Sequence, residues 1–159
     1  GMQHKLDDEY YERIDAMHFC LAHDDGQNLD GINKADVILV GVSRTSKTPT
    51  CMYLANKGIK AANVPFVPEI PPPQTLSDIK GPIVIGLTNT VDRLLELRLN
   101  RLFHLNQKAD TMYVNETFIE KEIREARVYF NKNKWPIIDV ARRSIEETAA
   151  KIMIYLNKH

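Results

Sequence analysis

Residues 37–49 have the sequence Val37-Ile38-Leu39-Val40-Gly41-Val42-Ser43-Arg44-Thr45-Ser46-Lys47-Thr48-Pro49. The four apolar residues at the start predict a short strand, and the helix-like stretch from Cys51 to Lys57 follows the proline. A strand, a turn of small residues, Lys-Thr and then a helix form the layout of a phosphate cradle. In such a cradle, backbone N–H groups point inward and the helix N-terminus adds positive dipole charge. The stretch therefore predicts a phosphate-binding strand–turn–helix unit.

The usual phosphate-loop pattern, G-x-x-x-x-G-K-[ST], is matched at Gly41, Lys47 and Thr48, whereas Ser46 replaces the second glycine. Left-handed backbone angles cost a serine more than a glycine. The alternative is an ordinary turn in which serine and threonine side chains cap the helix. We favour the cradle, with Lys47 and Arg44 neutralising phosphate charge and Thr48 holding Mg²⁺. Its expected members are Gly41, Val42, Ser43, Arg44, Thr45, Ser46, Lys47 and Thr48.

Length and composition bound the class of protein. The chain has 159 residues and a formal net charge of zero, which predicts one main domain and argues against a general nucleic-acid or membrane-surface binder. No apolar run is long enough to span a bilayer, and no signal-peptide pattern opens the chain. Cys20 and Cys51 lack metal-site spacing and are expected to be buried, which favours a reducing, cytoplasmic setting. Gly1-Met2 resembles a cloning remnant, so we expect the complete protein to be longer.

Apolar periodicity predicts helices that alternate with continuous apolar strands. The expected strands cover residues 36–40, 62–67, 83–87 and 136–140, and the expected helices cover residues 8–22, 51–57, 91–105, 115–131 and the stretch that begins at Ser144. Thr90 and a Ser144–Glu147 capping box mark two helix starts. This alternation is typical of an α/β fold, a parallel sheet with helices on both faces.

Two apolar faces are expected on the longer helices. The first consists of Tyr10, Ile14, Met17 and Leu21, and the second of Leu95, Leu99, Leu102 and Phe103. Residues 36–159 are expected to form the P-loop-like α/β domain, and residues 1–35 a helix and a linker to an N-terminal part that this chain lacks. The sequence does not fix the oligomeric state, but Phe66 and Trp135, if exposed, could serve an interface in a homo-oligomer.

A second anion site is predicted after the last strand. Ligands bind at the carboxyl ends of parallel strands, so residues 41–48, 67–80, 87–91 and 140–144 are expected to converge. Asp139 ends a strand and is a candidate for holding Mg²⁺ through water or accepting a hydroxyl proton. The predicted anion site consists of Arg142, Arg143 and Ser144, because guanidinium groups bind phosphate through two hydrogen bonds. The alternative is a pair of solvated arginines and a carboxylate bonded to local backbone.

Two further groups have open interpretations. The turn His23-Asp24-Asp25-Gly26 contains acid–base groups, although such turns more often bond to local backbone. Arg98 and Arg101 lie one turn apart and could reach a ligand, but the helix pattern places them on a solvated face away from the leucines.

Several of these segments together resemble one family, the regulatory proteins of pyruvate, phosphate dikinase and of phosphoenolpyruvate synthase. The resemblance covers nearly the whole chain and is carried by residues 41–49, 52–56, 62–65, 138–140 and 142–149, and by the turn from His23 to Gln27. Members of the family are longer, and this chain resembles their C-terminal part.

The resemblance implies a bifunctional enzyme. One activity uses ADP to phosphorylate a threonine of the target enzyme, whose nearby catalytic histidine must itself be phosphorylated. The other removes that phosphate with inorganic phosphate as the acceptor and gives pyrophosphate. The implied co-substrates and cofactor are ADP, inorganic phosphate and Mg²⁺, and the implied partner is pyruvate, phosphate dikinase or phosphoenolpyruvate synthase, in the cytoplasm.

Two other functions remain open from the residues alone. The first is an ATP-dependent small-molecule kinase. The second is a non-catalytic module that senses nucleotide or phosphate in the cradle and docks a partner through the stiff loop Pro71-Pro72-Pro73.

Overall fold

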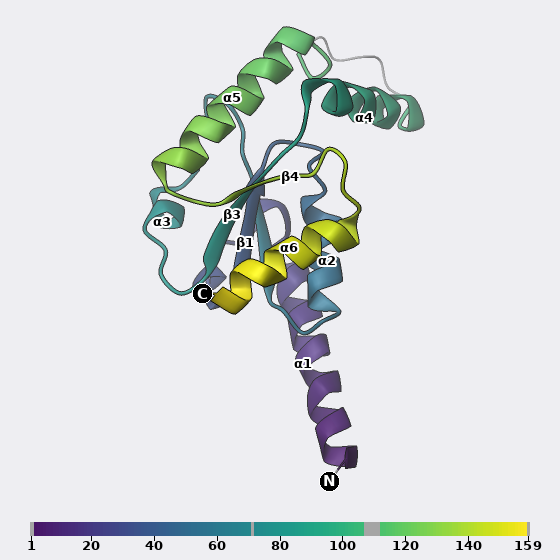
Figure 1. Cartoon of the computed structure of the whole chain (residues 1–159), viewed down its shortest axis with the longest axis vertical. Helices are drawn as coiled ribbons and strands as arrows, with labels where there is room; N and C mark the ends of the chain where they lie inside the picture. Colours follow the sequence, from purple (N-terminus) through teal and green to yellow (C-terminus); the bar gives the residue numbers. More distant parts are fainter. Residues whose placement is uncertain (1, 71, 107–111, 159) are drawn as a thin grey trace.

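The computed structural model of the chain describes residues 2–70, 72–106 and 112–158. Four strands form one parallel sheet in the order β2-β1-β3-β4 (Figure 1). The strands are β1 (Val37–Gly41), β2 (Ala61–Pro65), β3 (Ile83–Thr88) and β4 (Ile137–Asp139). The predicted α/β class is confirmed. Gly1, and Pro71 of the predicted docking loop, lie outside the described residues.

Helices cover both faces of the sheet (Figure 1). One face packs against α1 (Met2–Ala22), α2 (Lys47–Ala55) and α6 (Ile145–Lys158), and the other against α3 (Gln74–Ser77), α4 (Val91–His104) and α5 (Glu116–Lys132). Val37 and Leu39 of β1 join the first core cluster, whereas Ile38 and Val40 join the second. Successive side chains of a strand point to opposite faces, so this continuous apolar run is buried on both sides.

The predicted helix starts at residues 90 and 144 are confirmed. The backbone N–H of Arg93 donates to the Thr90 hydroxyl oxygen over 3.2 Å. The Glu147 N–H donates to Ser144 Oγ over 3.1 Å, and the Ser144 N–H donates back to Glu147 Oε1 over 3.4 Å. These bonds satisfy N–H groups that the first helical turn leaves without partners.

The predicted apolar face of α1 is only partly confirmed. Ile14 and Met17 are half-buried, but Tyr10 and Leu21 are exposed, and the buried residues of the helix are Ala16 and Cys20. Ala16 and Cys20 instead join the core cluster that contains α2, where Cys20 Sγ lies 3.5 Å from Met52 Sδ. Cys20 and Cys51 are buried as predicted.

The face of α4 also differs from the prediction. Its buried residues are Leu94, Arg98 and Leu102, while Leu99 and Phe103 are exposed. Leucines lie on two faces of this helix, so either face could be buried. The face that is buried in the structure is the one that contains Arg98. The placement of Arg98 on a solvated face is therefore wrong.

Phe66 and Trp135 do not form an exposed surface. Phe66 is buried, Trp135 is half-buried, and both rings pack with Tyr129 and Phe130 of α5. Aromatic rings in edge and tilted contact stabilise this part of the core. Phe66 is therefore not exposed enough to serve the predicted interface, and Trp135 is only partly exposed.

Strand order places the cradle at a favourable point of the sheet. From β1 the chain first moves to β2 on one side, and later returns to β3 on the other side. The segment that follows β1 therefore lies at the topological switch point, where open parallel sheets bind their ligands.

Candidate functional site

The bend between β1 and α2 has the backbone form of an anion cradle. Arg44 and Ser46 both have left-handed conformations, with φ of 71° and 63°. Alternating backbone hands turn successive N–H groups towards one point. Ser46 precedes α2 but makes no capping bond with its side chain, so the alternative of a serine cap is not supported at this residue.

Gly41 lets this bend lie against the sheet. A Cβ atom there would lie 2.7 Å from Thr45 Oγ1 and 2.8 Å from the Leu87 carbonyl oxygen. Real Cβ atoms do not approach other atoms that closely, so the first glycine of the pattern is required by close packing.

Lys47 is buried at the base of the bend. Its ammonium group donates to the Val42 carbonyl oxygen over 2.9 Å, and Thr45 Oγ1 donates to the same oxygen over 2.9 Å. Burial lowers the pKa of Lys47 to about 8, against an opposing effect from Asp25, while Arg44 lowers it further. Among the residues that the structure describes, no carboxylate lies within ion-pair distance of this ammonium. A bound anion would supply the missing counter-charge.

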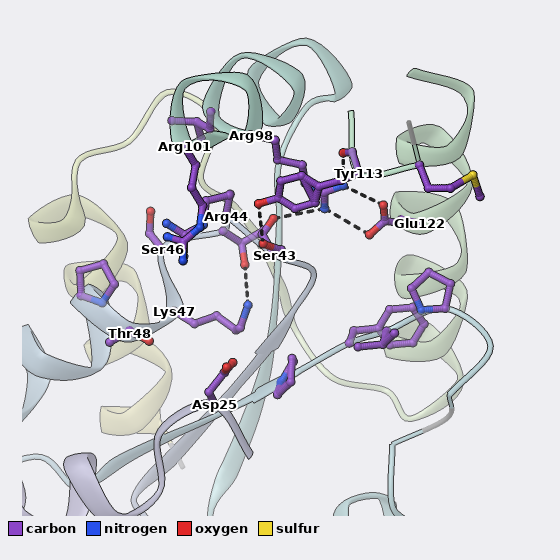
Figure 2. A pocket seen from close by; sticks show the side chains of 18 of the residues that line it. Asp25, Ser43, Arg44, Ser46, Lys47, Thr48, Arg98, Arg101, Tyr113 and Glu122 are labelled. Atoms are coloured by element: carbon purple, nitrogen blue, oxygen red, sulfur yellow. Dashed lines mark hydrogen bonds and ion pairs between the residues drawn. The ribbon is translucent and has the colours of Figure 1, made fainter. Parts of the chain in front are cut away.

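The turn after α1 faces the start of α2. Thr48 Oγ1 donates to Asp24 Oδ1 over 2.8 Å, and Asn63 Nδ2 donates to the same oxygen over 2.7 Å. Asn63 Oδ1 in turn accepts the backbone N–H of Asp25 over 3.0 Å. These bonds fix the turn and leave the exposed carboxylate of Asp25 at the cavity, across from Lys47 (Figure 2).

His23, the first residue of this turn, does not line the cavity. It is buried, its Nδ1 lies 2.7 Å from the Asn28 carbonyl oxygen, and its ring packs on Phe19. His23 therefore holds the turn in place. Asp24 and Asp25 both line the cavity, and Asp24 is the one bonded to Thr48 and Asn63.

A cavity of about 750 Å³ opens over the cradle. The charged groups at its walls come from the turn, the cradle and the two helices α4 and α5. The lining residues are Asp24, Asp25, Ser43 to Pro49, Pro65 to Pro68, Leu97, Arg98, Arg101, Met112, Tyr113, Phe118 and Glu122. Arg101 extends from α4 towards Arg44 (Figure 2). The cavity thus joins an end lined by the cationic side chains of the bend to an end that also contains apolar side chains, such as Met112 and Phe118.

The sequence analysis did not predict the ion pair between Arg98 and Glu122 in the wall of this cavity. Both are buried, and Arg98 Nη1 donates to Glu122 Oε1 over 2.8 Å. One signal was available: Leu94 and Leu102 bracket Arg98 at helical spacing, and Ile119 and Ala126 bracket Glu122. A charge within the apolar stripe of each of two helices indicates a buried pair.

The predicted second anion site is not brought to this cavity. Asp139, Arg142 and Arg143 line a separate depression of about 510 Å³, together with Thr90, Ala141 and Glu147. Arg143 Nε donates to the Asp139 carbonyl oxygen over 2.9 Å, and the Asp139 carboxylate accepts the Ala141 N–H. Ser144 Oγ accepts the Glu147 N–H. Of the four loops expected to converge, residues 41–48 and the start of 67–80 line the main cavity.

The described residues contain neither a membrane-spanning helix nor a cluster of metal ligands. None of the helices there combines the length and hydrophobicity needed to cross a bilayer. No three His, Cys, Asp or Glu side chains within those ranges are grouped as metal ligands.

Fold and bend together define a class: an open parallel α/β protein with a cradle-like strand–bend–helix unit at its switch point. Within that class, the chain belongs to the kinase/pyrophosphorylase family, whose model matches residues 1–153.

The chain is also similar to several named proteins. The chain is 54% identical over 153 residues to a pyruvate, phosphate dikinase regulatory protein of Sphingopyxis alaskensis, covering 96% of this chain and 57% of that protein. A protein of the same name from Rhodospirillum rubrum is 54% identical, with 96% and 56% covered. One from Wolbachia pipientis is 51% identical, with 97% and 57% covered. The chain thus spans about half the length of the curated relatives it matches.

Proposed function

We propose that this chain carries the catalytic site of a bifunctional enzyme that regulates pyruvate, phosphate dikinase or phosphoenolpyruvate synthase. It acts as an ADP-dependent serine/threonine protein kinase and as a phosphate-dependent, pyrophosphate-forming phosphorylase. The observation that carries the proposal is the arrangement of one cavity, in which the cradle and Lys47 lie opposite the carboxylate of Asp25. The family assignment and the names of the relatives support it.

In the kinase direction the cradle binds the β-phosphate of ADP. The threonine hydroxyl oxygen attacks the β-phosphorus, the new O–P bond forms, and the bond to the bridging oxygen breaks to release AMP. Asp25 accepts the hydroxyl proton. Lys47, Arg44 and Arg101 neutralise the charge on the transferred group, which is the main requirement of phosphoryl transfer.

In the phosphorylase direction the same groups act in reverse order. An oxygen of inorganic phosphate, held where the α-phosphate of ADP lay, attacks the phosphorus of phosphothreonine. The threonine oxygen leaves and takes a proton from Asp25, and pyrophosphate forms. One cavity serves both reactions because the phosphoryl group passes between the same two positions.

A magnesium ion fits the edge of this cradle. The hydroxyl of Thr48 and the carboxylate of Asp24 are hydrogen-bonded to each other over 2.8 Å, and hard oxygen donors of these two kinds hold Mg²⁺ beside phosphates. When bound, the ion supplies charge neutralisation at phosphate oxygens. Arg142, Arg143 and Ser144 remain a predicted separate anion site, since Arg142 and Arg143 line a different depression.

The deciding experiment supplies the chain with target enzyme whose catalytic histidine is phosphorylated, and compares ADP with ATP. Phosphothreonine on the target together with AMP is the expected product. Turnover of a metabolite with ATP would instead support a small-molecule kinase. Nucleotide-dependent binding of the partner without any product would support a sensing module.

A further inference from the structure

The buried ion pair between α4 and α5 has more partners than a structural pair requires. Arg98 is 1% exposed and Glu122 6% exposed. Their groups meet in a bidentate arrangement, with Nη1 to Oε1 at 2.8 Å and Nη2 to Oε2 at 3.1 Å. This geometry fixes the guanidinium plane as well as its charge.

Both Nη atoms of Arg98 also donate hydrogen bonds to groups outside the ion pair. Nη1 also donates to the Tyr113 carbonyl oxygen over 3.1 Å, and Nη2 donates to the Ser43 carbonyl oxygen over 3.4 Å. The Tyr113 ring lies over the guanidinium, with its centroid 4.8 Å from the central carbon. The Tyr113 hydroxyl lies 3.2 Å from Ser43 Oγ. Arg98 therefore connects the cradle with the segment before α5 (Figure 2).

The contact to Ser43 has a direct effect on the anion-binding backbone. In a trans peptide the carbonyl of one residue and the N–H of the next point in opposite directions. Holding the Ser43 carbonyl against Arg98 therefore fixes the Arg44 N–H on the opposite side of that peptide. The left-handed conformation of Arg44, which is unfavourable for a non-glycine residue, needs such an external hold.

Stability alone does not explain the pair. Burying two charges costs about as much free energy as their attraction returns, and apolar replacements are often as stable. The Nε of Arg98 is also buried without a hydrogen-bond partner among the described residues, which is a further cost. The ion pair costs desolvation free energy but holds the Arg98 guanidinium in one fixed orientation. This combination favours a role in positioning neighbouring groups.

We propose that Arg98 and Glu122 are positioning residues that preform the phosphate cradle. Glu122 fixes the guanidinium, and Arg98 fixes the Ser43 peptide and Tyr113, so the N–H groups are oriented before the substrate enters. The inference rests on the proposed function for its ligand, but the geometry of the bend can be measured without any ligand.

The test uses Arg98→Lys and Glu122→Gln, with Arg93→Lys as the matched control. Arg93 lies on the same helix in an exposed pair with Glu96, outside the cavity. We expect amide hydrogen exchange of residues 43–46 to become faster in both variants while the strands stay protected. ADP affinity should fall by about tenfold, the effect of losing one charge-assisted hydrogen bond. The control should change neither quantity.

Other outcomes overturn the proposal. If Arg98 binds phosphate directly, Glu122→Gln frees its charge and ADP binds more tightly. If the pair is merely structural, the melting temperature falls while ADP affinity and cradle exchange well below that temperature stay as in the wild type. A wild-type chain that binds no ADP contradicts the proposed function, yet the exchange measurement still decides the positioning role.

Discussion

The ammonium group of Lys47 donates a hydrogen bond to the carbonyl oxygen of Val42, five residues earlier in the same bend. A buried cation thus rests on a neutral acceptor, within a cavity wall that also carries Arg44 and Arg101. This is the state expected of a site that gains its counter-charge from a ligand.

Replacing Lys47 by alanine should abolish both activities and leave the fold intact. The lost charge acts on the transferred phosphoryl group, and removing one such preorganised contact costs about 10²–10³ in rate. Removing a poorly solvated cation should not lower the melting temperature. Steady-state assays in both directions and circular dichroism measure this, and near-normal activity in either direction would refute a shared site.

ADP affinity should decrease as the pH rises above about 8. The pKa of Lys47 in the folded protein is lowered to about 8 from 10.5, so the free lysine is charged below this pH and neutral above it. An anion binds the charged form, and affinity then falls by up to about tenfold per pH unit. Calorimetric titrations between about pH 7 and 9.5 measure this.

Unfolding would not account for that loss. Between about pH 8 and 10.5 the unfolded chain binds more protons at Lys47 than the folded chain does, so the contribution of this residue to stability rises with pH. Affinity that stays constant across the range would show that Lys47 does not contact the anion.

Ser46→Gly should stabilise the chain by about 0.5–1 kcal/mol and preserve ADP binding. Relief of the left-handed serine is worth about 1–2 kcal/mol, and the greater freedom of glycine in the unfolded chain returns up to about 1 kcal/mol. Arg44→Gly is the matched variant, because Arg44 has the same backbone hand. It should gain similar stability but lose ADP affinity. Urea unfolding and calorimetry separate the two effects.

Asp25→Asn should reduce the catalytic rate by about 10²–10⁴ with little change in ADP affinity, since general-base catalysis contributes that much. Asparagine also tolerates the positive φ of 56° at this residue. The comparison is Asp24→Asn, which alters the partner of Thr48 and should act on magnesium dependence. An Asp25→Asn enzyme with wild-type rate would eliminate this carboxylate as the base.

The double variant Arg142→Ala and Arg143→Ala should leave ADP affinity unchanged, because these side chains line a separate depression. If these arginines bind free phosphate in that depression, the KM for phosphate should rise while ADP affinity stays unchanged. A decrease in ADP affinity would mean that the two depressions join when the nucleotide binds. Paired calorimetric and phosphorylase measurements distinguish these results.

The elements that could be predicted from the sequence are those whose signal is local. The apolar run of β1, the Ser144 capping box and the match to the cradle pattern each depend on neighbouring residues, and the strands and helices follow from them. The conformation of Ser46 confirms that this position takes the backbone form of a glycine.

The wall of the cavity depends on distant partners. Whether Arg98 faces water or Glu122 is decided by the helical phase of α4 against α5, and leucines on both sides of that helix make the phase ambiguous. Arg142 is likewise separated from the cradle because the loop after β4 opens onto a different depression. In that loop the Ala141 N–H and Arg143 Nε both donate to Asp139. The local pattern can indicate that a charge is buried, as the leucines that bracket Arg98 do, but it does not name the partner of that charge.

Gly86 in β3 allows α5 to pack closely against the sheet. A Cβ atom there would lie 2.3 Å from Cδ2 of Phe130, so the ring occupies the volume that a side chain would take. Glu122 lies eight residues earlier on the same helix, roughly 12 Å along its axis. The close contact between Gly86 and Phe130 therefore sets how near α5 lies to the sheet, and with it the position of Glu122 in the wall of the cavity.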